Sequence, residues 1–298
     1  MTDAHRRHPR IVYLGGLGVL LVVVLAYTLG RVDRCESDAA AVVVAILAKD
    51  KAHILPYYLE ALYRQTYPKS AVHLWVRSNN NNDETVEVLR AWLHQHGHEY
   101  ASVSSDFTDV PESVQYFAPH EWNALRFRVL GRIRQQSVQY AIDRGAHYFV
   151  VDCDNLLYPS VLERLVQLNR TVVAPMLRSA HGNGFYSNYH SAIDANGYYA
   201  TADIYYDLLH RRVVGVTPQP VVHCTYLVSN AVLPHVSYDD DSRRYEYVIF
   251  SHSMRRADIV QYLDNREEYG FVSMADTRDE LLAEPWFNEY RRKMYIDY

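Results

Sequence analysis

The feature that most constrains the fold is an alternation of apolar runs and amphipathic segments after residue 40. A continuous β-branched run at 41–48 is typical of a strand in a covered sheet, and the segments at 71–78, 147–155 and 171–177 are also predicted to be strands. Between them, segments at 53–67, 83–96, 122–144 and from Pro159 onward have the character of helices, whereas 100–121 has no period and is predicted to be a loop. This order predicts an α/β domain with a mainly parallel (mixed) sheet flanked by helices.

The first forty residues form a separate segment. Residues 11–30 are twenty consecutive uncharged, mostly apolar residues, long enough as a helix, at about 1.5 Å per residue, to cross a bilayer. Arg6, Arg7 and Arg10 precede the run and mixed charges follow it, which predicts a cytoplasmic N-terminus. We therefore expect a single-pass type II membrane protein of the ER or Golgi. It would have a cytoplasmic tail at 1–10, a transmembrane signal anchor at 11–30, a stem at 31–40 and a lumenal domain at 41–298. A cleaved signal peptide or a buried helix is the alternative interpretation of the run.

Charge and cysteine content narrow the function classes. The net charge of −5 gives no sign of a nucleic-acid partner. Three cysteines are too few for a disulfide framework; Cys35, in the predicted stem, either joins two chains as a dimer or stays free. A single glycosylation sequon at Asn169 agrees with a lumenal domain.

The strongest candidate site is the sequence Asp152-Cys153-Asp154-Asn155 at the end of the strand in 147–155. Ligands of parallel sheets bind beyond the carboxyl ends of the strands. Two carboxylates there can hold a hard divalent cation whose open positions take phosphate oxygens. A metal–diphosphate site is therefore predicted, with Cys153 as apolar filler; a helix-capping turn before Pro159 is the alternative.

Polar groups also follow the first two strands. Lys49 and Asp50 come after the first, and the run 78–83, with four asparagines, comes after the second. Asn and Asp favour turns, so a plain loop explains the run as well as hydrogen bonding to a base or ribose does. Arg134, near the middle of the helix predicted at 122–144, could pair with a diphosphate.

Two further candidates lie later in the chain. His223 falls inside a strand predicted at 220–228 and is either a satisfied core histidine or a metal ligand. Glu246 sits among apolar residues after an acidic run; it is either a general base with a raised pKa or a solvent-facing helix residue.

Several segments together resemble the amino-terminal domain of the collagen hydroxylysine galactosyltransferases. Between about residues 42 and 271 they are, in order, ILAKDKAHILPYYLEALYRQTYP, LWVRSNNNNDET with VLRAWL, HYFVVDCDN, NRTVVAPML, YSNY, VVHCTYLV and NREEYGF. The resemblance implies a GT-A nucleotide-sugar transferase that uses UDP-galactose and Mn²⁺ and places β-linked galactose on hydroxylysine of a collagen-like protein.

The resemblance also implies roles for individual residues. By position, Asp152 and Asp154 would bind the metal, His223 would be its third protein ligand, and Asn155 would support them. Asn81, Asp83 and Thr85 match the motif on the nucleotide side, and Arg134 and Gln135 match the helix motif that faces the donor. Glu246 falls on the second of two adjacent family aspartates and would be the catalytic base. Asn79 and Tyr245 stand where the family has aspartates.

The function expected from these features is a metal-dependent inverting hexosyltransferase. Tyrosines are abundant, 26 against 8 phenylalanines, and those between 185 and 206 could stack on sugar rings. The alternative is a catalytically inactive, membrane-tethered adhesion or carbohydrate-binding module on the same fold.

Overall fold

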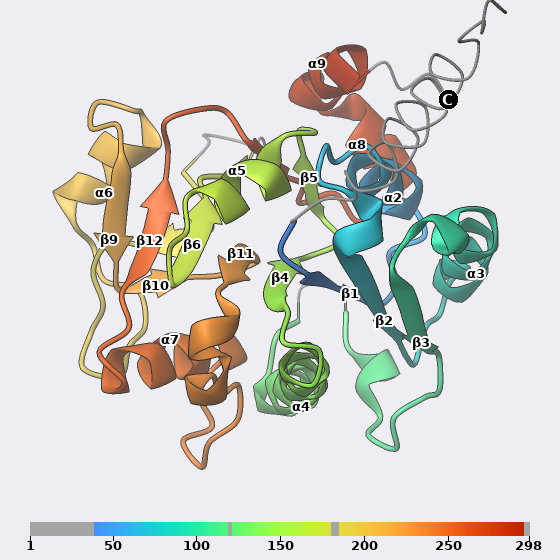
Figure 1. Cartoon of the computed structure of the whole chain (residues 1–298), viewed down its shortest axis with the longest axis horizontal. Helices are drawn as coiled ribbons and strands as arrows, with labels where there is room; N and C mark the ends of the chain where they lie inside the picture. Colours follow the sequence, from blue (N-terminus) through green and yellow to red (C-terminus); the bar gives the residue numbers. More distant parts are fainter. Residues whose placement is uncertain (1–38, 119–120, 180–184, 295–298) are drawn as a thin grey trace, which may run out of the picture. The chain divides into compact units, whose positions relative to one another are not determined.

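The computed structural model describes residues 39–118, 121–179 and 185–294, which belong to one unit, Ala39–Tyr298 (Figure 1). The predicted anchor at 11–30 and Cys35 lie outside these residues. Among the described residues, no helix has the length and apolar character needed to cross a membrane.

The centre of the unit is an eight-stranded sheet with the order β3-β2-β1-β4-β11-β6-β12-β9. Its parallel part consists of β1 (Val42–Ala48), β2 (Val72–Ser78), β3 (Ser102–Asp106) and β4 (His147–Val151). Next to β4, β11 (Thr225–Val228) runs antiparallel; β6 (Val172–Pro175) and β12 (Gln261–Asp264) are parallel to each other, and β9 (Val216–Gln219) closes the edge antiparallel to β12. The mainly parallel, mixed sheet is thus confirmed.

Strand β1 is the point at which the chain changes direction across the sheet. From β1 the chain passes to β2 and β3 on one side, and then returns to β4 on the other side, so that Val42 faces both Val72 and His147. Such a reversal leaves a crevice at the carboxyl ends of the two central strands. These are the ends that carry Lys49 and Asp152.

Helices cover both faces of the sheet, because side chains of a strand alternate between its faces. Val42, Val44 and Ile46 of β1 join one core cluster with α2 (Leu55–Tyr63), α3 (Thr85–His96), α5 (Val161–Gln167), α8 (Arg278–Ala283) and α9 (Pro285–Met294). Val43 and Ala45 join the other, with α4 (Ala124–Ile142), α6 (Asp203–Leu209) and α7 (Glu246–Arg256).

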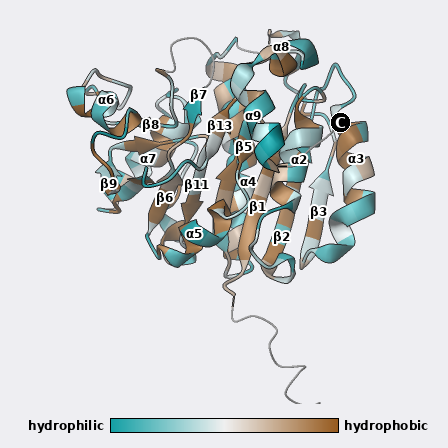
Figure 2. Cartoon of the chain, turned by 90° about the horizontal axis from the view of Figure 1, so that it is seen from above, coloured by the Kyte–Doolittle hydropathy of each residue, from teal (hydrophilic) through white to brown (hydrophobic). Residues whose placement is uncertain are grey.

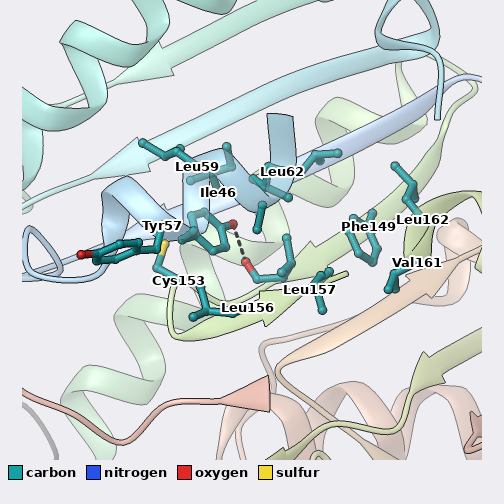
Figure 3. Packing of buried hydrophobic residues seen from close by; sticks show 14 of the residues in the cluster. Ile46, Tyr57, Leu59, Leu62, Phe149, Cys153, Leu156, Leu157, Val161 and Leu162 are labelled. Atoms are coloured by element: carbon teal, nitrogen blue, oxygen red, sulfur yellow. Dashed lines mark hydrogen bonds between the residues drawn. The ribbon is translucent and has the colours of Figure 1, made fainter. Parts of the chain in front are cut away.

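The pictures show this layered arrangement. Figure 1 has α2 and α4 on opposite sides of the sheet, and Figure 2 shows the apolar strands between more polar helices. In Figure 3, Ile46 lies in one cluster with Leu59 and Leu62 of α2 and with Leu156 of β5 (Asn155–Leu157).

Short elements complete the unit. Two small sheets are formed by β5 (Asn155–Leu157), β13 (Gly270–Val272) and β7 (Arg178–Ser179), and by β8 (Tyr189–His190) and β10 (Val221–Val222). Single 3₁₀ turns occupy Lys69–Ala71, Gly97–Glu99 and Val114–Tyr116, and a longer one Asn230–His235.

Two expectations from the sequence are wrong. The predicted loop at 100–121 contains strand β3, which pairs with β2 at the edge of the sheet and is largely exposed, so it has no apolar signature. The strand predicted at 220–228 is broken at His223 and Cys224, because Cys224 has a φ of 64° and bends the chain between β10 and β11, which belong to different sheets.

Candidate active site

A cleft of about 520 Å³ opens at the carboxyl ends of β1 and β4. Most of the residues predicted from the sequence line it: Lys49, Asp50, Arg134, Asp152, Asp154, His223 and Glu246. Those that do not line it are Asn81, Asp83, Thr85, Gln135 and Asn155.

The acidic pair lies directly after β4, as predicted. Asp152 accepts a hydrogen bond from Arg134 Nη2 at 2.7 Å, and Asp154 Oδ2 accepts one from Lys51 Nζ at 3.2 Å. The two carboxylate side chains remain 30% and 27% exposed, on the wall of the cleft. Burial raises the pKa of Asp152, although Arg134 acts against this. Each carboxylate therefore has an internal cation as its partner.

Cys153, between the two aspartates, is buried and donates from Sγ to the carbonyl of Leu47 at 3.2 Å. Burial raises the pKa of its thiol, so it is a neutral, apolar filler as expected. Both Cys153 and Cys224 are free thiols.

Arg134 connects the acidic pair to Glu246. Its Nε lies 3.5 Å from Glu246 Oε1, and the two side chains are only 4% and 6% exposed. Burial opposes the charge of the guanidinium, yet Asp152 and Glu246 raise the pKa of Arg134 above its usual value. Within the described residues, Arg134 Nε and Nη1 and Glu246 Oε2 are buried without a hydrogen-bond partner. Arg134 is thus held by protein carboxylates.

Glu246 is the first residue of α7 and is buried, so the interpretation as a solvent-facing residue is wrong. Burial raises its pKa to about 7, against the opposite effects of Arg134 and of the backbone N–H groups at the start of the helix. Such a carboxyl group exchanges its proton near neutral pH, as a general base requires.

Close packing of α4 holds Glu246 in this place. Gly131 of α4 lies against the carbonyl of Tyr238, where an added Cβ would come within 2.5 Å of the oxygen and 3.4 Å of Glu246 Cβ. Gln135, predicted to face the donor, instead accepts a hydrogen bond from the Tyr238 backbone N–H at 3.0 Å. Gln135 therefore fixes the segment that precedes α7.

The candidate nucleotide-side residues bind the loop after β1. Asn81 Oδ1 accepts from the backbone N–H of Asp50 at 2.9 Å, and Thr85 Oγ1 accepts from that of Lys51 at 2.7 Å. Asp83 accepts from the backbone N–H of Ala52 at 2.9 Å. We call these three bonds the loop clamp. The asparagine-rich run thus acts, at these positions, as a structural turn.

Lys49 and Asp50 form an ion pair with each other at the cleft, and Asp50 also accepts from the backbone of Asn82 at 2.6 Å. Asn155 is fully buried in β5, where its Nδ2 donates to Thr225 Oγ1 at 2.7 Å. It stabilises the start of β11 next to the acidic pair.

His223 lies on the cleft wall with Nδ1 at 2.8 Å from Cys224 Sγ. Burial, with the charges of His190 and Arg134, lowers its pKa to about 3, so the ring is neutral. In the part of the chain that the structure describes, no three His, Cys, Asp or Glu side chains gather as a metal site. The acidic pair nonetheless fits a hard cation, because two oxygen ligands reach the cleft; phosphate oxygens and water would complete the coordination.

Several cleft residues had no signal in the sequence. Lys51 is paired with Asp154, and His190 and Tyr247 lie near His223, with ring centroids 5.4 and 5.0 Å away. Burial lowers the pKa of His190 to about 4. His190 and Tyr247 stand outside the family-like segments, and Lys51 lies within one but was not singled out, so the role of all three became visible only from their position in the fold.

Aromatic rings form one side of the cleft mouth. Tyr245 stacks on Phe127 at 4.0 Å, and Phe127 stacks on Trp122 at 5.0 Å between centroids. Of the tyrosines proposed for sugar contacts, Tyr186 lines the cleft, whereas Tyr189 and Tyr205 are buried and stack on each other. The last two are core residues.

Comparison with known proteins identifies the family of this chain and agrees with its fold. Residues 39–285 match the model of glycosyltransferase family 25, N-terminal domain. Human procollagen galactosyltransferase 2 is 34% identical over 241 residues, which cover 78% of this chain and 38% of that protein. Mouse inactive glycosyltransferase 25 family member 3 is 31% identical over 282 residues, covering 89% and 46%.

The chain thus spans less than half the length of these two relatives. Among solved structures, S. aureus TarS 1-349 in complex with UDP-GlcNAc has a similar fold, with a TM-score of 0.52 and 13% identity, over 85% of this chain and 65% of that one. The motifs that resemble the collagen galactosyltransferases therefore reflect a real relationship. The chain belongs to glycosyltransferase family 25.

Proposed function

We propose that this chain is a metal-dependent inverting transferase that moves a hexose, galactose, from a UDP-sugar to a hydroxyl acceptor such as hydroxylysine of a collagen-like protein. The observation that carries the proposal is the position of Glu246, a buried carboxyl group with a pKa of about 7, in the same cleft as the acidic pair. The human relative named procollagen galactosyltransferase 2 supports galactose and the acceptor class.

In this mechanism Glu246 accepts the proton of the acceptor hydroxyl. The oxygen then attacks the anomeric carbon in line, as the bond from that carbon to the β-phosphate oxygen breaks. Asp152 and Asp154 would hold a divalent cation, which when bound compensates for the negative charge of the UDP leaving group. Arg134 keeps Glu246 and Asp152 in fixed positions, because it contacts both.

A donor screen tests the proposal. The full chain in detergent is given Mn²⁺ and each UDP-sugar, and UDP release is measured with and without a hydroxylysine peptide. We expect release to be greatest with UDP-galactose and the peptide, and Asp154→Ala to abolish it. Full Mn²⁺-dependent transfer by Asp154→Ala would contradict the mechanism.

A second candidate is a catalytically inactive, membrane-tethered carbohydrate-binding or adhesion module. The mouse relative named inactive favours it, as does Tyr245 in place of a family aspartate. Calorimetry with UDP, with and without Mn²⁺, separates the two, since a module of this kind need not bind the nucleotide.

The proposal includes a type II membrane protein with its transferase domain in the lumen of the ER or Golgi, anchored by residues 11–30. Protease protection of the lumenal domain in intact microsomes tests the orientation. Cys35 is the proposed site of a disulfide-linked dimer, which a non-reducing gel of the Cys35→Ser variant tests.

A further inference from the structure

Lys51 is a cation placed directly on the acidic pair. Its Nζ lies 3.2 Å from Asp154 Oδ2, and its side chain is 20% exposed on the cleft wall. The two partners are 103 residues apart in the chain and come together because the loops after β1 and β4 are neighbours. The loop after β1 therefore contributes a positive charge where a nucleoside diphosphate and a divalent cation would bind.

The loop clamp fixes the backbone of this lysine. Three successive backbone N–H groups, those of Asp50, Lys51 and Ala52, donate to side chains of the turn after β2 and of the first residue of α3. The clamp leaves the long side chain as the movable part, since four rotatable bonds separate the ammonium group from the backbone. Lys51 can thus change its partner without any change in the loop.

The other cation of the site differs in this respect. Arg134 is almost completely buried, and its planar guanidinium lies between Asp152 and Glu246. A rotation of this group would leave the buried Glu246 carboxylate and the partly exposed Asp152 carboxylate without a cation, and the loss at Glu246 is costly. Of the two cations on the acidic pair, Lys51 is the one able to leave.

The Lys51 ammonium and a divalent cation compete for the same carboxylate, because each is bound by the oxygens of Asp154. A diphosphate brings additional negative charge into the cleft, and a lysine ammonium binds phosphate as a point charge. A cation on Asp154 and a phosphate beside it would both favour transfer of the ammonium from Asp154 to the phosphate.

We propose that Lys51 is a mobile counter-ion, which pairs with Asp154 until a nucleoside diphosphate and a divalent cation bind, and then moves to the phosphate oxygens of the nucleotide. The inference rests on the proposed function and adds a donor-binding residue to it. It also assigns a role to Asn81, Asp83 and Thr85, whose hydrogen bonds to the loop after β1 hold the backbone of Lys51 near Asp154.

The test is a pair of affinities measured on the full chain and on Lys51→Met, which keeps the length of the side chain and removes its charge. For Mn²⁺ alone, followed by electron paramagnetic resonance, we expect Lys51→Met to bind about 3- to 10-fold more tightly, because the internal competitor is gone. For UDP at saturating Mn²⁺, followed by calorimetry, we expect about 10-fold weaker binding, because a charge-assisted hydrogen bond is lost.

Two variants serve as controls. Lys69→Met makes the same substitution outside the cleft, where Lys69 lies over the ring of Tyr63, and we expect it to leave both affinities unchanged. Lys51→Arg keeps the positive charge, and we expect it to recover most of the UDP affinity.

The opposite signs of the two effects are what a merely structural role would not produce. Unchanged or weaker Mn²⁺ binding by Lys51→Met would overturn the inference, and so would unchanged UDP binding. Failure of the unaltered chain to bind UDP would instead contradict the proposed function. UDP binding that is insensitive to Lys51 would contradict only the role of this residue.

Discussion

The two walls of the cleft differ in how completely their polar groups are paired. On the wall formed by the loops after β1 and β2, side chains of the loop clamp satisfy three successive backbone N–H groups. On the wall formed by α4, α7 and β8, the described residues include buried polar atoms without partners, on Arg134, Glu246 and His190. Unpaired buried groups are costly and rare in folded proteins. The first wall is therefore the more completely hydrogen-bonded of the two, and the unpaired groups of the second wall include Glu246, to which the proposed function assigns the proton transfer.

The largest expected effect comes from the carboxylate of the second wall. Glu246→Gln keeps the shape of the side chain and removes its ability to accept a proton, so we expect kcat to fall about 10²- to 10⁴-fold. UDP affinity should change little. Steady-state kinetics with the exposed Glu87→Gln variant as control checks this, and a normal kcat for Glu246→Gln would rule out Glu246 as the base.

The same carboxyl group makes stability depend on pH. Its pKa is about 7 in the folded chain against 4.5 for the free group, so the folded state holds the proton more strongly. The stability that this gives is complete below pH 4.5 and is lost as the pH rises to about 7. Between pH 4 and pH 8 the unaltered chain should lose about 3 kcal/mol of this contribution to its free energy of unfolding, whereas Glu246→Gln, which has no titrating group at this position, should not.

Urea denaturation of both proteins across this pH range measures the difference. If the two free energies of unfolding differ by the same amount at every pH, Glu246 has an ordinary pKa. The polar groups of the second wall would then be no less completely paired than those of the first.

A smaller effect is expected where α4 packs against the segment before α7. In Gly131→Ala the new Cβ would come within 2.5 Å of the Tyr238 carbonyl oxygen, so the helix must shift. We expect a loss of about 1–3 kcal/mol in the free energy of unfolding, despite the higher helix propensity of alanine. Thermal unfolding tests this; Gly145→Ala is unsuitable as a control, because Gly145 has a φ of 59°.

The smallest effect is expected in the first wall. Asp83→Ala removes the acceptor of the Ala52 and Thr85 backbone N–H groups, which should cost about 1–2 kcal/mol because water can replace part of the bonding. Asp83→Asn keeps an acceptor oxygen and should lose less. Equal stability of the two variants in chemical denaturation would show that the clamp does not depend on this carboxylate.

The sheet could be predicted wherever its strands are buried on both faces. The run at 41–48 became β1 and the run at 71–78 became β2, each within a residue of the expected bounds. Strand β3 could not be predicted, because an exposed edge strand rich in serine needs no apolar side chains. The break at Cys224 was also hidden, since a non-glycine residue with positive φ leaves no mark in the sequence.

The candidate site divides in the same way. The acidic pair follows a buried strand in the chain, so its position at the end of the sheet could be read from neighbouring residues. Asn81, Asp83 and Thr85 were predicted to lie on the nucleotide side, yet their side chains bind the loop of Lys51 and do not line the cleft. A motif identifies residue types, whereas the direction of each side chain depends on the packing around it.

The sequence by itself was enough to predict a covered parallel sheet and the acidic pair at a strand end, because each depends on residues close together in the chain. It also indicated the relation to family 25, because that relation rests on the order of short segments along the chain. The partners of the charges could not be obtained in this way. Lys51 meets Asp154 across 103 residues, and Glu246 meets Arg134 only because α7 packs on α4. Burial by distant elements sets the pKa of Glu246 and the pairing of both aspartates, and burial is a property of the folded chain alone.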